Sequence, residues 1–174
     1  MEERIDKSLD EENNKIDSNN NGNEISQDTK AAQPSLFDFI KGQMDLDELN
    51  INTLSPLVLA FIGDGVYDLV IRTIVVGKGN APVNDLHNQS SSLVKASAQA
   101  RLYRKIKDEL TDEEIRMFKR GRNAKINTQA KNASKSNYRI ATGFEALIGY
   151  LYLTNNFPRV LELIKIGLDS KGII

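Results

Sequence analysis

Apolar residues recur every three or four positions through most of the chain, which is the spacing of one face of an α-helix. The clearest case is residues 56–76. Ser55 is suited to cap this helix, and Pro56 occupies its first position, where a missing N–H has no cost. Gly77 is expected to end it. The expected buried face consists of Leu59, Ile62, Val66, Leu69 and Val70.

The same period predicts helices along the rest of this part of the chain. Thr111 and Glu114 form a capping box for one of them. No segment alternates between apolar and polar residues with a period of two, so an all-α fold is predicted. The further helices are expected at 83–108, 112–121, 138–154 and 158–168, with one or two short helices within 36–50.

Residues 1–35 have a different composition. They contain three isoleucines, one leucine, one methionine, no aromatic residue, and nine acidic against four basic residues. Such a segment cannot bury enough apolar surface to offset the entropy of ordering, so 1–35 is predicted to be a disordered acidic leader. The single folded domain is expected at 36–174, which is long enough for a sizeable core. This part is mildly basic, with 15 acids and 19 bases.

Several classes of protein are excluded by composition. The chain has no cysteine, so thiol catalysis and thiolate metal sites are ruled out. No apolar run approaches the ~20 residues of a membrane span, and the acidic start does not resemble a signal or transit peptide. A cytoplasmic protein without membrane contact is expected. The only histidine, His87, is either a structural residue near a helix start or the sole imidazole base, and we favour the first.

An aspartate lies within the apolar helix 56–76, between two glycines. Asp64 shares a stripe with Asp68 and Arg72, four residues apart, and such a stripe is often simply solvated. However, Gly63 and Gly65 each cost a helix interior about 1 kcal/mol relative to alanine. Two such glycines beside a carboxylate indicate that a helix or a ligand approaches the backbone closely.

A second carboxylate occurs on the apolar helix 138–154. Glu145 is the only acidic residue from 115 through 160, and its stripe contains Tyr138, Thr142 and Gly149. Either acid alone could be a surface residue, but together they suggest a paired site. Two facing carboxylates repel each other unless a cation lies between them, and oxygen ligands suit Mg²⁺, with Mn²⁺ possible. Asp64 and Glu145 are therefore the candidate metal ligands and catalytic residues.

The segment 116–139 contains eight lysines or arginines and no acidic residue. A charge run is usually a solvated face. Here it leads directly into the Glu145 helix and also carries amide and hydroxyl side chains, which favours contact with nucleic acid. Tyr138 and Arg139 are equally suited to ordering the loop or touching RNA. The candidate RNA-binding residues are Lys119, Arg120, Arg122, Asn123, Lys125, Lys131, Lys135, Tyr138 and Arg139.

Four separated segments resemble a known family in the right order. "LAFIGDGVYDLVIR" resembles the signature helix of ribonuclease III, and "ATGFEALIGYLYL" resembles its second acidic helix. Together with "RGRNAK" and "DLH", they resemble the Mini-ribonuclease III branch, which consists of catalytic domains without an appended double-stranded-RNA-binding domain. The resemblance covers about residues 54–168.

This resemblance implies an all-helical homodimer whose signature helices pack across a two-fold axis, which would explain Gly63 and Gly65. It implies Mg²⁺-dependent cleavage of double-stranded RNA to 5′-phosphate and 3′-hydroxyl ends, with Asp64 and Glu145 matching the acidic residues of the two motifs. The branch is associated with maturation of large-subunit (23S) ribosomal RNA, so a ribosomal RNA precursor is the expected substrate.

The chain also departs from the larger family. Leu57 and Ala60 stand where full-length ribonuclease III has glutamates, and Thr142 stands where it has an aspartate. These losses leave open how many ions bind. They also allow the alternatives of a catalytically inactive double-stranded-RNA-binding protein or a ribosome-associated dimer. A phosphohydrolase acting on small nucleotides would not need eight cations beside its site.

Overall fold

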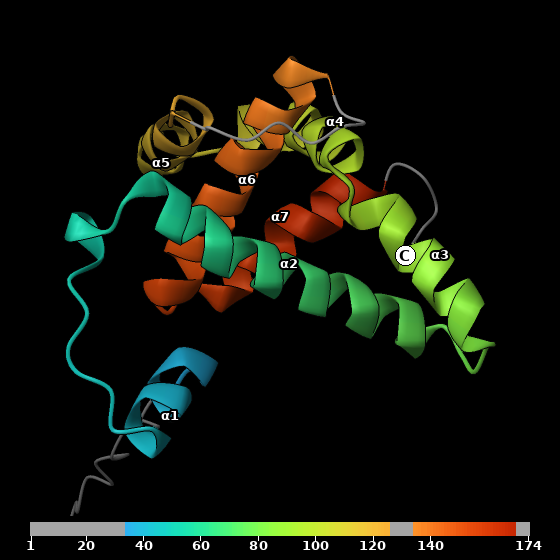
Figure 1. Cartoon of the computed structure of the whole chain (residues 1–174), viewed down its shortest axis with the longest axis horizontal. Coiled ribbons are helices and arrows are strands. Elements are labelled where there is room, and N and C mark those ends of the chain that lie inside the picture. Colours follow the sequence, from blue (N-terminus) through green and yellow to red (C-terminus); the bar gives the residue numbers. More distant parts are fainter. Residues whose placement is uncertain (1–33, 126–133, 170–174) are drawn as a thin grey trace, which may run out of the picture. The chain divides into compact units, whose positions relative to one another are not determined.

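The computed structural model describes residues 34–125 and 134–169, and every regular element in these ranges is a helix (Figure 1). The all-α prediction is thereby confirmed. None of these helices combines the length and apolarity that a membrane span requires. The predicted leader lies outside the described residues except for its last two positions. The elements are α1 (Leu36–Gln43), η1 (Ile51–Thr53), α2 (Pro56–Gly77), α3 (Val83–Val94), α4 (Ala96–Ile106), η2 (Lys107–Glu109), α5 (Asp112–Arg122), α6 (Lys135–Leu153) and α7 (Phe157–Asp169).

Side-chain caps start the helices where the sequence places them. The Ser55 hydroxyl accepts a hydrogen bond from the Val58 amide at the start of α2. At the start of α5, the Thr111 hydroxyl accepts from the Glu114 amide at 3.3 Å, and the Glu114 carboxylate accepts from the Thr111 amide at 2.8 Å. The predicted capping box is therefore confirmed, and it satisfies two N–H groups that a helix start leaves free.

The helix predicted over 83–108 is wrong as a single element. The backbone of Lys95 is extended, with φ −61° and ψ 148°, so α3 ends at Val94 and α4 begins at Ala96. The last residues of the predicted helix form the 3₁₀ turn η2. The apolar period continues through this break without a glycine or proline to mark it, which is why the pattern did not reveal it.

Helix α6 is the centre of the domain. Eleven of its nineteen residues are buried, and α2, α4, α5 and α7 all pack against it. In Figure 1, α6 crosses behind α2. Of the predicted inner face of α2, Leu59, Val66 and Val70 are buried, whereas Leu69 is 54% exposed.

Glycines permit the close crossing of α2 and α6. A Cβ atom on Gly63 would collide with the carbonyl oxygen of Glu145, and one on Gly149 would collide with the carbonyl oxygen of Leu59. The expectation of a close backbone approach is confirmed at Gly63, and the approaching element is α6 of the same chain. At Gly65 a Cβ would meet no atom of this chain within 4 Å, so a close approach there stays a prediction.

The two glycines of α2 should therefore respond oppositely to alanine. We expect Gly63→Ala to lower the free energy of unfolding by about 3 kcal/mol, because the added methyl forces α2 away from α6. In the monomer, where a Cβ at Gly65 meets no atom within 4 Å, Gly65→Ala should raise it by up to about 1 kcal/mol through helix propensity. Urea unfolding of the two variants beside the parent measures both, and equal effects would contradict this account of the crossing.

Candidate active site

The crossing of α2 and α6 brings the two predicted carboxylates to one place. Asp64 follows Gly63, whose backbone contacts the carbonyl of Glu145. The side chain of Asp64 is exposed, whereas Glu145 is largely enclosed, and the two are close enough for the charge of Asp64 to act on Glu145. The site is thus a pair of acids, one facing solvent and one facing inward.

This environment disfavours the charged form of both acids. Burial, and after it the negative charge of Asp64, raise the pKa of Glu145 to about 7, while the nearby amide of Gln99 acts in the opposite direction. The pKa of Asp64 is raised by partial loss of water and then by the charge of Asp68. In the described part of the chain, no lysine or arginine forms an ion pair with either acid.

The neighbouring acid on the stripe has a different role. Asp68 accepts a hydrogen bond from the guanidinium of Arg72 at 2.6 Å, which confirms the predicted i,i+4 pair. Both side chains are partly exposed, so the pair contributes only a few tenths of a kcal/mol. Asp68 therefore has a cationic partner, whereas Asp64 has none among the described residues.

The positions that depart from the larger family help to define the site. Ala60 and Thr142 are both buried, at 6% and 5% exposure, and the Thr142 hydroxyl donates to the Tyr138 carbonyl. These two residues are therefore packing residues in this chain. Within residues 34–125 and 134–169, no group of three or more His, Asp or Glu side chains gathers. The chain presents two carboxylates where a metal ion would bind.

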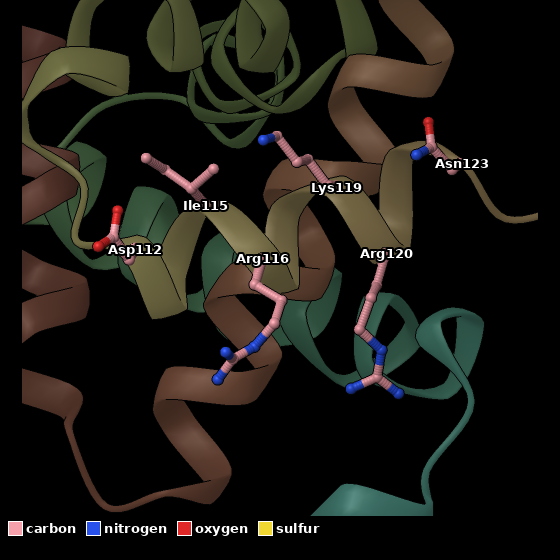
Figure 2. Close-up of a pocket in the computed structure, with 6 residues that line it drawn as sticks. All are labelled: Asp112, Ile115, Arg116, Lys119, Arg120 and Asn123. Atoms are coloured by element: carbon pink, nitrogen blue, oxygen red, sulfur yellow. The ribbon is translucent and has the colours of Figure 1, made fainter.

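A cationic hollow lies along α5, and three of the candidate RNA-binding residues line it (Figure 2). Lys119 and Asn123 are exposed. Arg120 is partly committed to the fold, because its guanidinium donates to the Leu54 carbonyl at 3.1 Å and so ties α5 to the start of α2. Arg116 also lines this hollow, although the sequence did not single it out.

A second cationic hollow lies between the end of α5 and the start of α6. It is lined by Arg122, Lys135 and Arg139. Arg139 donates to the Arg122 carbonyl at 3.0 Å, so it orders this junction as well as adding charge. Lys125 is exposed beside it and Tyr138 is half-buried. Lys131 lies outside the described residues.

Two residues outside these hollows complete the account of the sequence candidates. His87 is exposed on α3 and lines a separate hollow with Arg72 and Ser90. Gln99 of α4 was missed, although it is almost fully buried and close enough to Glu145 to lower the pKa of that carboxyl group. A signal for it was present, because Gln99 is a polar residue in register with the buried Leu102 and Ile106.

Comparisons with known proteins agree with this geometry. Residues 57–156 match the Ribonuclease III domain family, and the chain belongs to that family. It is 51% identical to the Mini-ribonuclease 3 of Clostridium tetani over 69% of this chain and 80% of that one. It is 46% identical to the Mini-ribonuclease 3 of Thermoanaerobacter sp. over 79% of this chain and 96% of that one.

A solved structure is also similar. The crystal structure of a Fusobacterium nucleatum protein superposes with a TM-score of 0.66 at 29% identity, covering 71% of this chain and 99% of that one. The fold class and the family expected from the sequence are therefore confirmed. The protein is an endoribonuclease of the ribonuclease III family, similar over most of its length to Mini-ribonuclease 3 proteins.

The raised pKa of Glu145 predicts a pH-dependent stability in metal-free protein. Between about pH 4.5 and 7 the folded chain keeps a proton that the unfolded chain releases, so the free energy of unfolding should fall as pH rises through this window. The loss attributable to Glu145 should be at most about 3 kcal/mol. Glu145→Gln should remove it and be the more stable protein at pH 8, as urea unfolding at pH 5 and pH 8 would measure.

Glu114 provides a control of opposite sign. Although burial opposes it, hydrogen bonds from Arg159 and Thr111 hold the pKa of Glu114 below its ordinary value. Its contribution to stability is present at neutral pH and is lost as pH falls. A Glu114→Gln variant should therefore lose more stability at pH 8 than under acid. If the free energy of unfolding of Glu145→Gln fell with pH as steeply as that of the wild-type protein, burial of Glu145 would not be the cause of the pH dependence.

Proposed function

We propose that this endoribonuclease cleaves double-stranded RNA in a Mg²⁺-dependent reaction that leaves 5′-phosphate and 3′-hydroxyl ends, with Asp64 and Glu145 holding the ion. The observation that carries the proposal is the pair of unneutralised carboxylates at the α2–α6 crossing, with raised pKa values and no cationic partner among the described residues. Such an arrangement is unfavourable in itself and is relieved by a divalent cation.

The chemistry of the donor set supports Mg²⁺, with Mn²⁺ as the alternative. Both acids provide oxygen ligands, which hard cations prefer, and the chain contains no cysteine that would favour a soft metal. Two carboxylates fill only part of the shell of Mg²⁺, which usually keeps several waters and binds substrate phosphates. When bound, such an ion supplies an activated water and neutralises charge that develops on the scissile phosphate.

The protein's own residues would divide the remaining work. Glu145, which is half-protonated near pH 7, must lose its proton to become a ligand, whereas the exposed Asp64 is open to an incoming phosphate. Lys119, Asn123, Lys135 and the other exposed polar residues around the two hollows would bind phosphate and ribose oxygens of the duplex. A-form RNA is recognised mostly through shape and 2′-hydroxyls, so little base specificity is expected.

We also propose that the active protein is a homodimer formed through the exposed face of α2. Phe61 is 82% exposed, and Leu57, Val58 and Leu69 are exposed on the same helix, an apolar surface that is unusual for a helix facing water. A second copy of the chain is the occupant that the family resemblance implies. Sedimentation of the full chain measures this directly.

The biological substrate follows from the resemblance rather than from the site. We propose a precursor of large-subunit (23S) ribosomal RNA, cleaved in the cytoplasm. The second candidate function, an inactive double-stranded-RNA-binding protein, is favoured by the packing roles of Ala60 and Thr142 at positions where the larger family has acids. Cleavage and binding assays on the same samples separate the two.

The first test is cleavage of a long RNA duplex with and without Mg²⁺. We expect metal-dependent cutting by the wild-type chain and a loss of at least about 100-fold in Asp64→Asn and in Glu145→Gln, because each removes a metal ligand. Asp68→Asn is the matched control on the same helix and should cut like the parent. Binding of the duplex without cutting in any divalent ion would establish the inactive alternative instead.

The cationic hollow of α5 can be tested by the salt dependence of binding. Lys119→Ala should weaken duplex affinity uniformly across sequences and reduce the slope of log Kd against log salt concentration by about one, as expected for one lost phosphate contact. Lys107→Ala, at an exposed lysine of η2, is the matched control. The slopes are measured in chains that also carry Asp64→Asn, which prevents cleavage. Equal slopes for both lysine variants and the parent would mean that the duplex does not contact the hollow of α5.

A further inference from the structure

A buried amide lies beside the candidate metal ligands, on a helix that carries neither of them. Gln99 in the first turns of α4 is 1% exposed. Its Nε2 donates to the carbonyl of Val94 at 3.0 Å, and the amide lies close enough to the Glu145 carboxylate to lower the pKa of that group. Gln99 therefore connects the corner between α3 and α4 to the inward-facing acid of the site.

The bond to Val94 fixes the orientation of this amide. Lys95 is extended, so the carbonyl of Val94 lies at the end of α3 without a helical partner, and the amide of Gln99 provides one. With one proton donated to Val94, the remaining proton of Nε2 is available to the carboxylate of Glu145. The break between α3 and α4 thus places a donor on a residue of the site.

The other end of the amide is left without a partner. Oε1 of Gln99 is the one buried side-chain polar atom, among the residues that the structure describes, for which no hydrogen bond is formed. An unpaired buried acceptor costs about 1–3 kcal/mol, so the metal-free fold alone does not account for glutamine at this position. A water brought in with a bound cation would supply the missing donor.

We infer that Gln99 is a positioning residue of the active site: it orients the carboxylate of Glu145 for a divalent cation and offers Oε1 to a water of that cation. It would act through Glu145 rather than as a ligand itself. This inference rests on the proposed metal-dependent function and names how this chain supports a two-carboxylate site.

The test is a Gln99→Met variant, which keeps the size of the side chain and removes the polar amide. Mg²⁺ binding to the RNA-free protein is measured by calorimetry, beside kcat and KM for duplex cleavage. We expect metal affinity to fall by about 10- to 100-fold and kcat at fixed Mg²⁺ to fall similarly, with KM for RNA unchanged, because supporting partners of metal ligands typically have effects of this size.

Ser90→Ala is the matched control. Ser90 is 2% exposed in the neighbouring α3, and its hydroxyl donates to backbone carbonyls within that helix. This variant should lose stability without changing Mg²⁺ affinity. Gln99→Asn, which withdraws the amide by one methylene, should weaken metal binding in the same direction as Gln99→Met.

The outcomes separate the two proposals. Weakened Mg²⁺ binding by folded Gln99 variants supports the positioning role. Wild-type Mg²⁺ affinity and kcat in a folded Gln99→Met variant would overturn it, as would failure of both Gln99 variants to fold, which would make Gln99 a determinant of the fold. If the wild-type protein itself neither binds Mg²⁺ nor cuts, the proposed function fails first.

Discussion

The close crossing of α2 and α6 is the contact on which the site depends. Gly63 and Gly149 remove the two Cβ atoms that would hold these helices apart, so the backbone of each helix rests on a carbonyl of the other. Since α6 is also the helix around which α4, α5 and α7 pack, its distance from α2 determines how the core closes. Asp64 and Glu145 come together because they flank this contact.

The same contact explains why the charged forms of the two acids are disfavoured. Helices that approach this closely exclude water from the space between them, and Glu145, whose carbonyl lies at this contact, is partly buried. Burial then raises its pKa, and the charge of Asp64 adds to the effect. The site is therefore a place where the fold gives up stability, as functional sites often do, and the cation that we propose would recover it.

Much of this could be predicted from the sequence because the signals are local. Ser55 and the Thr111–Glu114 box act within one helical turn, so the starts of α2 and α5 are readable from a few residues. The pairing of Asp64 with Glu145 was predicted because each is an acid on an otherwise apolar, glycine-bearing helix.

Other features depend on tertiary contacts, which the spacing of apolar residues along the chain does not reveal. Gly63 and Gly65 look alike in sequence, but only the first faces α6. Leu69 was assigned to the buried face because helical period cannot tell a buried apolar position from an exposed one. The break at Lys95 has no punctuating residue, and the role of Gln99 depends on that break.

The distribution of charge around the site gives its basic residues two functions. Arg120 and Arg139 each bond a backbone carbonyl and so fix where α5 meets α2 and α6, whereas Lys119 and Lys135 remain exposed. An anionic duplex approaching two unneutralised carboxylates would be repelled at short range, so exposed cations must hold its phosphates on either side. Because the arginines anchor the same helices that carry the lysines, the duplex would be held at a fixed distance from the α2–α6 crossing. The position of the phosphate relative to the two acids would then depend on how the core packs, and the close contact at Gly63 is the part of that packing nearest to the acids.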